Sequence, residues 1–400
     1  MNSQPKVALL VETARGYGRQ MLRGIVRYSR LHGPWGFCLT PGDFEQAVPK
    51  VREWGGTGII ARIETPRVAQ AILDSGLPTI VLDLSRSQLA AESPLLQFSE
   101  VKSGSRDAGM MAAEYLVQRG FREFAFVGIP DRVWSKDREE GFCKAIRSAG
   151  FEVHVYQPPK SRRERVLERE QPRLAKWLAS LPRPIAMMAC NDDRGREVAE
   201  ACHFADIKIP EELVLIGVDN DELLCELADP PLSSVALNAT GVGFRAAELL
   251  DRMMKGEVVE PQCLIAEPLS VVTRRSTDMI AIDDPEVVEA LRFIHDRSNE
   301  PIQVADILRR VDISRRNLEL RFSRAVGRTL HAELQRVRLE RARTLLAESD
   351  LSVPKIATAS GYGTPSYFIQ VFRTTYGITP SRFRRELRGE RDAAKPTIES

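Results

Sequence analysis

Short apolar runs alternate with helical patterns along residues 6–275. The run at 7–11 has the length of a buried strand, and 19–31 repeats apolar residues at the spacing of one helical face. The predicted strands are 7–11, 36–39, 58–63, 79–84, 123–129, 153–157, 185–190 and 213–218. One predicted helix lies between 39 and 58, and the others lie at 19–31, 104–119, 137–149, 163–180 and 194–205. Because strands that are apolar throughout are covered on both faces, the pattern predicts two α/β lobes with doubly wound parallel sheets.

A different pattern fills residues 302–388, where a short helix, a tight turn and a second helix occur twice. Leu318 and Phe322 stand one helical turn apart, and Phe368 and Phe372 repeat that spacing. The positions that recur after 50 residues are Phe322 and Phe372, Gly327 and Gly377, and Thr329 and Thr379. The repeat predicts an all-α domain with two helix-turn-helix motifs.

Capping residues set where each second helix begins. Ser314 and Thr364 occupy N-cap positions, while Pro365 and Pro380 occupy first helical positions. With the apolar pairs turned inward, the outward residues are Arg315, Arg316, Glu319 and Ser323 in the first copy, and Ser366, Tyr367, Ile369, Gln370 and Arg373 in the second. Arginine and glutamine reach base edges in a major groove, so these faces are candidates for reading double-stranded DNA.

Positive charge is concentrated in the same region. Residues 301–388 hold 17 lysines and arginines against 8 aspartates and glutamates, a balance of +9, whereas the whole chain carries +2. Such an excess is typical of nucleic-acid binding, the alternative being a solvated arginine-rich bundle. Between the copies, apolar positions predict a helix of about 17 residues, which spans about 25 Å and could hold the two motifs about one turn of DNA apart.

Residues 285–388 resemble the DNA-binding domain of the AraC/XylS family of transcription regulators. The motifs are Ile356-Ala357 through Gly361-Tyr362, Tyr367-Phe368, Phe372-Arg373, Tyr376-Gly377 and Thr379-Pro380. The resemblance implies that Arg315, Arg316, Glu319, Ser366, Gln370 and Arg373 face DNA. Leu320 departs from the family, which often has a polar or basic residue there, and its side chain could instead touch a thymine methyl.

Polar residues of the N-terminal part follow several predicted strands, where open α/β sheets bind ligands. They include Trp134, Arg138 and Asp219. Carboxylates accept hydrogen bonds from sugar hydroxyls, arginine donates them, and aromatic rings cover the apolar sugar face. Each residue also has a structural alternative: Asp219 could cap a turn, Arg138 could pair with Glu139, and Trp134 could belong to the core.

Residues 6–276 resemble the LacI/GalR-type ligand-binding domain, which is similar to periplasmic sugar-binding proteins. The motifs are Arg138-Glu139-Glu140-Gly141-Phe142, Cys190-Asn191-Asp192, Pro210-Glu211-Glu212, Leu215-Ile216-Gly217-Val218-Asp219, Leu232-Ser233-Ser234-Val235 and Val272-Thr273-Arg274-Arg275-Ser276. The resemblance implies that Arg138, Asp192 and Asp219 contact a sugar.

Together the two parts resemble the family of xylose-operon activators, and Tyr17, Arg19 and Trp134 suit that group. The resemblance implies a xylose effector, with another pentose or a hexose as the alternative. It also implies activation, with repression as the alternative, a homodimer, and RNA polymerase as a partner. The expected domains are a sensor at 1–276, a linker at 277–285, a DNA-binding domain at 286–390 and a tail at 391–400.

Other function classes have weaker support. Asp192, Asp193 and Asp219 could serve an enzyme, but no nucleophile or phosphate-binding motif accompanies them, and Met21 stands where a dinucleotide fingerprint needs glycine. A DNA binder that ignores sugar is the third class. Dispersed cysteines and histidines predict neither a metal site nor a cofactor. Without an export signal or a membrane span, the chain is expected in the cytoplasm.

Overall fold

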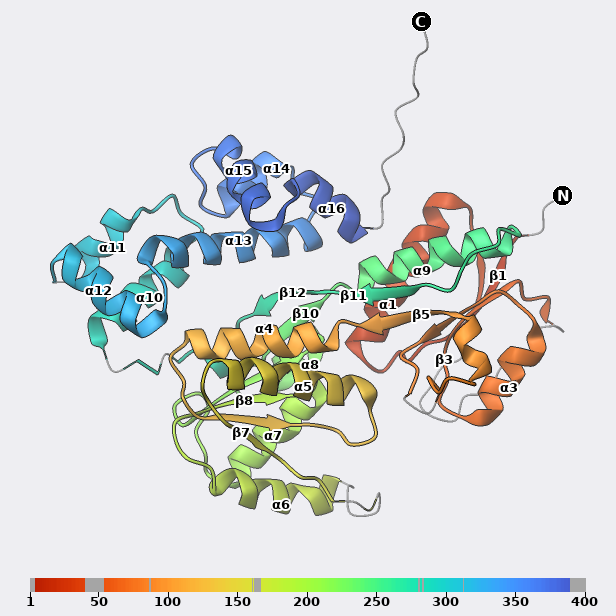
Figure 1. Cartoon of the computed structure of the whole chain (residues 1–400), viewed down its shortest axis with the longest axis horizontal. Helices are drawn as coiled ribbons and strands as arrows, with labels where there is room; N and C mark the ends of the chain where they lie inside the picture. The colour runs from red at the N-terminus through yellow and green to blue at the C-terminus, as the bar shows by residue number, and fades with distance from the viewer. Residues whose placement is uncertain are drawn as a thin grey trace, which may run out of the picture.

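The structure is a computed structural model that describes residues 4–39, 54–85, 88–159, 161, 167–279, 281–282, 284–311 and 313–388. Two α/β lobes precede a helical domain (Figure 1). The two-lobed fold and the helical domain predicted from the sequence are therefore confirmed. The predicted helix between 39 and 58 and the tail at 391–400 lie outside, or almost wholly outside, the described residues.

Lobe 1 is built around a parallel sheet whose described strands follow the order β11-β5-β4-β3-β1-β2. Alternate residues of β1 face opposite sides, so Val7 packs with α1 and α9 while Ala8 packs with α3. The elements are β1 (Lys6–Leu10), α1 (Gly16–His32), β2 (Gly36–Leu39), β3 (Gly58–Arg62), α3 (Pro66–Ser75), β4 (Thr79–Leu82), the 3-10 turn η1 (Pro94–Gln97), β5 (Ser99–Ser103), α9 (Ala239–Met254) and β11 (Cys263–Ala266).

Lobe 2 has the strand order β12-β10-β9-β8-β6-β7, parallel except where β12 pairs antiparallel with β10. Phe124 and Phe126 of β6 pack with α4 and α5, and Ala125 and Val127 pack with α6 and α7. The elements are α4 (Ser105–Gln118), β6 (Phe124–Val127), α5 (Val133–Ser148), β7 (Val153–Val155), α6 (Leu167–Ala179), β8 (Ile185–Ala189), α7 (Asp192–Phe204), β9 (Leu213–Val218), α8 (Glu222–Leu227), β10 (Ser233–Leu237), β12 (Pro268–Val272) and the 3-10 turn η2 (Arg275–Thr277).

The helical domain contains the two predicted motifs, here called the first reading unit (α11 and α12) and the second reading unit (α14 and α15). The long helix α13 joins them, and α16 packs on the second through Phe383. The elements are α10 (Pro285–Arg297), α11 (Val304–Arg310), α12 (Arg315–Val326), α13 (Leu330–Glu348), α14 (Val353–Ala359), α15 (Pro365–Tyr376) and α16 (Pro380–Arg388). Leu318 and Phe322 are buried in one core, and Phe368 and Phe372 in another, as predicted.

One of the two predicted caps differs from the prediction, and the segment predicted as a linker contacts lobe 2. The Thr364 side chain accepts a hydrogen bond from Tyr367 N, which confirms that cap, whereas Ser314 stands at the N-cap without such a bond. Within the predicted linker, Thr277 is buried and its hydroxyl lies 2.8 Å from Tyr115 Oη. Ala281 N donates to Arg119 O at 2.8 Å, so part of this segment is fastened to α4 of lobe 2.

Three helices begin earlier than predicted, and all three differences concern the ligand site. Helix α1 begins at Gly16 rather than at 19, which places Tyr17 in its first turn. Helix α5 begins at Val133 rather than at 137, which places Trp134 in its first turn. Helix α7 begins at Asp192 rather than at 194, because Asn191 caps it by accepting a hydrogen bond from Arg194 N. The residues at these helix starts were predicted to lie outside the helices, because the apolar periodicity of each helix begins only about one turn later.

Candidate ligand cleft and DNA-reading surface

A polar cleft lies between the lobes, at the carboxyl ends of their parallel strands. Both lobes contribute side chains, so neither lobe forms the site alone. The lining residues are Val11, Glu12, Arg15, Tyr17, Gly18, Met21, Arg62, Leu82, Asp83 and Ser103 from lobe 1, and Trp134, Arg138, Asn191 and Asp219 from lobe 2. This is the position at which open α/β sheets bind ligands.

An ion pair between Arg138 and Asp219 forms part of the lobe 2 wall. Arg138 Nη2 donates to Asp219 Oδ1 at 2.7 Å, and Nη1 donates to Cys190 O at 2.5 Å. The side chains are only 3% and 13% exposed. Burial raises the pKa of Asp219, and the charge of Arg138 opposes that rise. Asp219 also has φ +102°, a conformation that side chains rarely adopt and that is often found at functional sites.

Lobe 1 presents a second arginine–aspartate pair. Arg62 ends β3 and Asp83 follows β4, and Arg62 Nη2 donates to Asp83 Oδ2 at 2.6 Å. The other oxygen of Asp83 accepts from Ser103 N at 3.1 Å, which orients the carboxylate. Each pair balances its own charge, so the cleft offers donors and acceptors without a strong net charge. Such a lining suits an uncharged ligand rich in hydroxyls.

Two buried polar atoms in this lining are not engaged by the protein. Among the described residues, Tyr17 Oη and Arg138 Nε have no hydrogen-bond partner. Burial raises the pKa of Tyr17 well above its usual value, so its hydroxyl stays neutral and can donate. Trp134 lies nearby, with its ring centroid 5.1 Å from the guanidinium carbon of Arg138. Free donors beside an aromatic face match the polar and apolar sides of a sugar ring.

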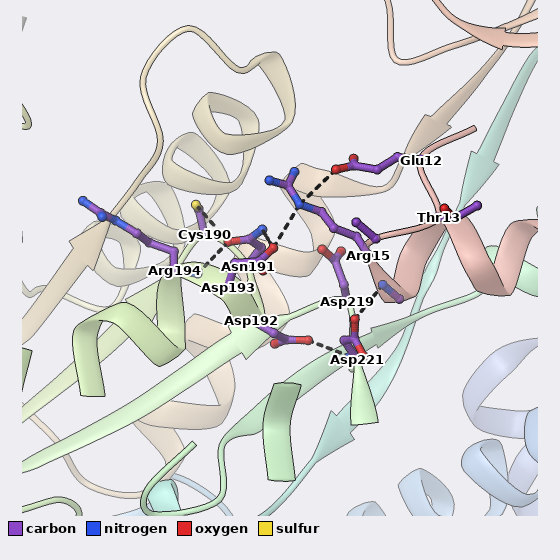
Figure 2. Close-up of polar contacts among 12 residues, drawn as sticks. Glu12, Thr13, Arg15, Cys190, Asn191, Asp192, Asp193, Arg194, Asp219 and Asp221 are labelled. Atoms are coloured by element: carbon purple, nitrogen blue, oxygen red, sulfur yellow. Dashed lines mark hydrogen bonds and ion pairs between the residues drawn. The ribbon is translucent and has the colours of Figure 1, made fainter. Parts of the chain in front are cut away.

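Ion pairs also join the lobes around the cleft. Arg15 Nε lies 3.5 Å from Glu12 Oε1 in its own lobe and 3.0 Å from Asp193 Oδ2 in lobe 2 (Figure 2). Glu64 of lobe 1 and Arg132 of lobe 2 form another pair, at 3.0 Å. These ion pairs join lobe 1 to lobe 2 near the cleft.

Of the six predicted ligand-binding residues, the structure brings Tyr17, Trp134, Arg138 and Asp219 to the cleft wall. Arg19 and Asp192 are outside this lining. Arg19 Nη2 donates to both oxygens of Asp221, at 2.8 and 2.7 Å.

The Asp192 carboxylate accepts from Asp221 N, just beyond β9, at 2.7 Å (Figure 2). It also accepts from Ser234 Oγ of β10 at 2.6 Å. Both Arg19 and Asp192 thus fix Asp221, whose carboxylate also accepts from Gly16 N at 2.7 Å. In this structure they position the loops around the cleft.

Sequence reasoning missed Arg62, Asp83 and Ser103. All three lie at or just beyond the carboxyl end of β3, β4 or β5. Arg62 and Asp83 were missed because the strands 58–63 and 79–84 were predicted to run past them, whereas β3 ends at Arg62 and β4 ends at Leu82. Ser103 was missed because β5 was not predicted: its residues Ser99 and Glu100 are polar although buried.

The predicted DNA-facing residues lie on one surface of each reading unit. Arg315 and Arg316 are exposed at the start of α12, and Arg315 pairs with Glu319 at 3.0 Å. Ser366, Gln370 and Arg373 are exposed along α15. Helix α13 has 19 residues rather than about 17, so it spans about 28 Å.

Comparison with known proteins places the chain in a family. A XylR N-terminal domain matches residues 6–98, a periplasmic binding protein-like domain matches 113–277, and a helix-turn-helix domain matches 307–386. The xylose operon regulatory protein of Escherichia coli (strain K12) is 33% identical over 95% of this chain and 96% of its own length. The protein of the same name from Haemophilus influenzae is 30% identical over 95% and 98%.

The chain belongs to the family of xylose operon regulatory proteins. A solved structure described as the xylose-binding transcription activator XylR is similar with a TM-score of 0.60 and 30% identity, over 96% of this chain and 98% of that one. As a member of this family, the chain is a DNA-binding transcription regulator with a sugar-sensing domain. The combination of domains predicted from sequence motifs is thus confirmed.

Two further observations concern the described residues only. No helix among them has both the length and the apolar character needed to cross a bilayer. No group of three or more histidine, cysteine, aspartate or glutamate side chains among them is arranged to hold a metal ion.

Proposed function

We propose that this xylose operon regulator binds D-xylose or a closely related pentose in the cleft and that the bound sugar controls transcription through the two reading units. The observation that carries the proposal is the pair of arginine–aspartate contacts that face each other from the two lobes. The same cleft is lined by the unengaged Tyr17 hydroxyl and by the Trp134 ring. A neutral sugar that satisfies donors on both lobes binds the closed arrangement best and shifts the population toward it.

The proposed sugar-contacting residues are Tyr17, Trp134, Arg138 and Asp219, together with Arg62 and Asp83. Arg19 and Asp192 act by holding Asp221 at the rim. On DNA, the proposed contacts are Arg315, Arg316, Glu319, Ser366, Gln370 and Arg373. By family membership we also propose a homodimer that activates transcription with RNA polymerase and has no catalytic activity.

A thermal-shift panel of pentoses and hexoses tests the ligand. A sugar at 100 times its Kd stabilises the folded state by about 2.7 kcal/mol, which raises Tm by about 5 °C or more. D-xylose is expected to give the largest shift. A larger shift with a hexose would replace the proposed sugar, and no shift with any sugar would refute the sensing function.

Asp219→Asn tests the site. The amide keeps the shape of the carboxylate but leaves Arg138 buried without its counter-charge, so D-xylose affinity measured by calorimetry should fall by about 100-fold or more. DNA affinity without sugar should change little. Asp206→Asn is the matched control, because Asp206 also has a positive φ, +54°, but lies exposed and away from the cleft. Unchanged sugar affinity in Asp219→Asn would remove Asp219 from the site.

A further inference from the structure

The hinge between the lobes is a bundle of neighbouring chain segments. The chain crosses from one lobe to the other at Gly104 between β5 and α4, at Asn238 between β10 and α9, and at Glu267 between β11 and β12. Gly104 N donates to Ala266 O at 2.9 Å, and Asn238 N donates to Glu267 O at 2.8 Å. Any rotation of one lobe against the other therefore turns about these segments.

Helix α16 of the DNA-binding domain rests on the lobe 1 side of this hinge (Figure 1). Asn238 Nδ2 donates to the backbone oxygen of Leu387 at 3.2 Å. The same oxygen would lie 1.9 Å from a Cβ atom at position 241, so only glycine permits this approach of α16 to the first turn of α9. The glycine at position 241 of α9 therefore makes this contact with α16 possible.

Helix α13 rests on the lobe 2 side. Arg343 Nη2 donates to Pro268 O at 3.1 Å, and the hydroxyls of Ser270 and Thr344 lie 2.9 Å apart. Pro268 and Ser270 belong to β12, which is an edge strand of the lobe 2 sheet. The two helices that flank the second reading unit therefore touch different lobes.

Aromatic packing joins these two helices into one body. The Arg343 guanidinium carbon lies 5.3 Å from the Tyr376 ring centroid and 5.9 Å from that of Phe383. Phe383 of α16 packs edge-on against Phe372 of α15, with centroids 5.3 Å apart. A body packed in this way moves as a unit rather than deforming smoothly.

We propose that the second reading unit straddles the hinge and is the part of the DNA-binding domain that senses lobe closure. The inference rests on the proposed sugar response. When the lobes rotate, a rigid unit cannot keep both the α16 contact with lobe 1 and the α13 contact with lobe 2. The unit shifts relative to the first reading unit, whose adjoining segment is fastened to lobe 2 through Ala281 and Arg119. Sugar binding thereby changes the spacing of the two units on DNA.

The Asn238→Asp variant removes the hydrogen bond from residue 238 to α16 and keeps the N-cap of α9. Asn238 Oδ1 accepts from Gly241 N at 3.1 Å, and an aspartate keeps that acceptor. The aspartate lacks the Nδ2 donor and turns a negative oxygen toward Leu387 O, so α16 should detach while α9 stays capped. Gly241→Ala disturbs the same contact sterically, because its Cβ would lie 1.9 Å from Leu387 O, and it also crowds the Asn238 side chain, at 2.4 Å from Oδ1. Gly36→Ala is its control, because a Cβ there meets Lys6 Cγ at an ordinary 3.6 Å.

Hydrogen exchange of the full chain with and without D-xylose gives the first readout. In the wild type and in Gly36→Ala, D-xylose should change exchange in residues 380–388 by about 5-fold or more. In Asn238→Asp and Gly241→Ala the same peptide should exchange fast with or without sugar, while the D-xylose Kd by calorimetry stays within about 3-fold. The affinity for a duplex selected from a random pool should respond to D-xylose in the wild type and not in these variants.

The outcomes separate the two proposals. If the wild type binds no sugar of the panel, the proposed function fails and this coupling fails with it. If the wild type binds D-xylose and Asn238→Asp transmits the sugar signal to DNA as the wild type does, the hinge contact is refuted and the proposed function stands. Loss of D-xylose binding in Asn238→Asp would also refute it, because the contact would then belong to the fold of the sensor.

Discussion

The two reading units repeat the same positions 50 residues apart, yet different interactions fix their turns. In the first, α11 ends at Arg310, and the next residue, Val311, has an extended conformation with φ −112° and ψ 138°. In the second, the turn passes through Gly361 at φ +74°. A Cβ on Gly361 would lie 2.1 Å from the backbone oxygen of Ser298. The first turn tolerates ordinary side chains, and the second requires the smallest residue.

Their surfaces differ as well. The equivalent outward positions are Arg315 and Pro365, Arg316 and Ser366, Glu319 and Ile369, Leu320 and Gln370, and Ser323 and Arg373. Charged side chains thus gather at the start of α12, whereas the charged side chain of α15, Arg373, stands toward its end. The inward pairs are apolar in both units, whereas the outward residues differ, so the two helices present different chemistry to the two segments of DNA that we propose they read.

Arg338 connects the two units and explains why the second turn is so constrained. Its guanidinium donates to the backbone oxygens of Ser298, Glu300 and Ile302, at 3.3, 2.8 and 2.8 Å. Gly361 lies against the first two of these oxygens. The segment between α10 and α11 is therefore held by the connecting helix and by the second turn, and these contacts stabilise the relative position that the two units have in this structure.

Gly361→Ala is expected to have the largest effect. The substitution adds a Cβ against two carbonyl oxygens at a positive φ, which should lower the free energy of unfolding of the helical domain by about 3 kcal/mol or more. Gly363→Ala is the control within the same turn, because a Cβ there meets nothing within 4 Å. Its cost should stay within about 1 kcal/mol. Chemical denaturation followed by helix content measures both, and equal losses would show that the second turn is not specially constrained.

How much of this could be predicted from the sequence depends on how local each signal is. The inward pairs, the Thr364 cap and strands such as β1 and β9 follow from residues that are neighbours along the chain. The partners of Arg19 and Asp192 do not. Asp221 is 202 residues from Arg19, and Ser234 is 42 residues from Asp192. Strand-end position predicted that both residues lie near the cleft, but only tertiary contacts decide which side chains face a ligand.

Strands β5 and β10 were missed for a related reason. Their sequences, SEVKS and SSVAL, carry polar residues that are nevertheless buried. Glu100 accepts from Leu84 N at 2.9 Å, and Ser233 N donates to Ser276 Oγ at 2.8 Å. Since distant segments supply these partners, a window of neighbouring residues shows a polar loop where the structure has a sheet strand. The hinge contacts of α16 and α13 are equally long-range.

Exchanging one pair of outward residues should have an intermediate effect. Gln370→Leu gives the second unit the residue of the first, and it removes a side chain suited to adenine. We expect about a tenfold loss of discrimination at one base pair, measured by competition binding among single-base variants of a selected duplex. Leu320→Gln is the reciprocal variant, and its effect should fall about one turn of DNA away. If both variants alter the same base pair, the two units do not read separate segments.

Acidification should give the smallest effect and act on the first unit. His295 of α10 lies 3.6 Å from Glu333 of α13, close to Arg336 and Arg119. Burial lowers the pKa of His295, so the unfolded chain takes up the proton at a higher pH than the folded one does. Stability is then intact above about pH 6.5 and falls as the pH drops below it, by at most about 1.4 kcal/mol near pH 5.5. The hydrogen-exchange rates of α10 and α12, corrected for intrinsic rates, should rise as stability falls, whereas the rates of α15 should not. In His295→Gln the pH dependence over that window should disappear, and its persistence would assign the effect to another group.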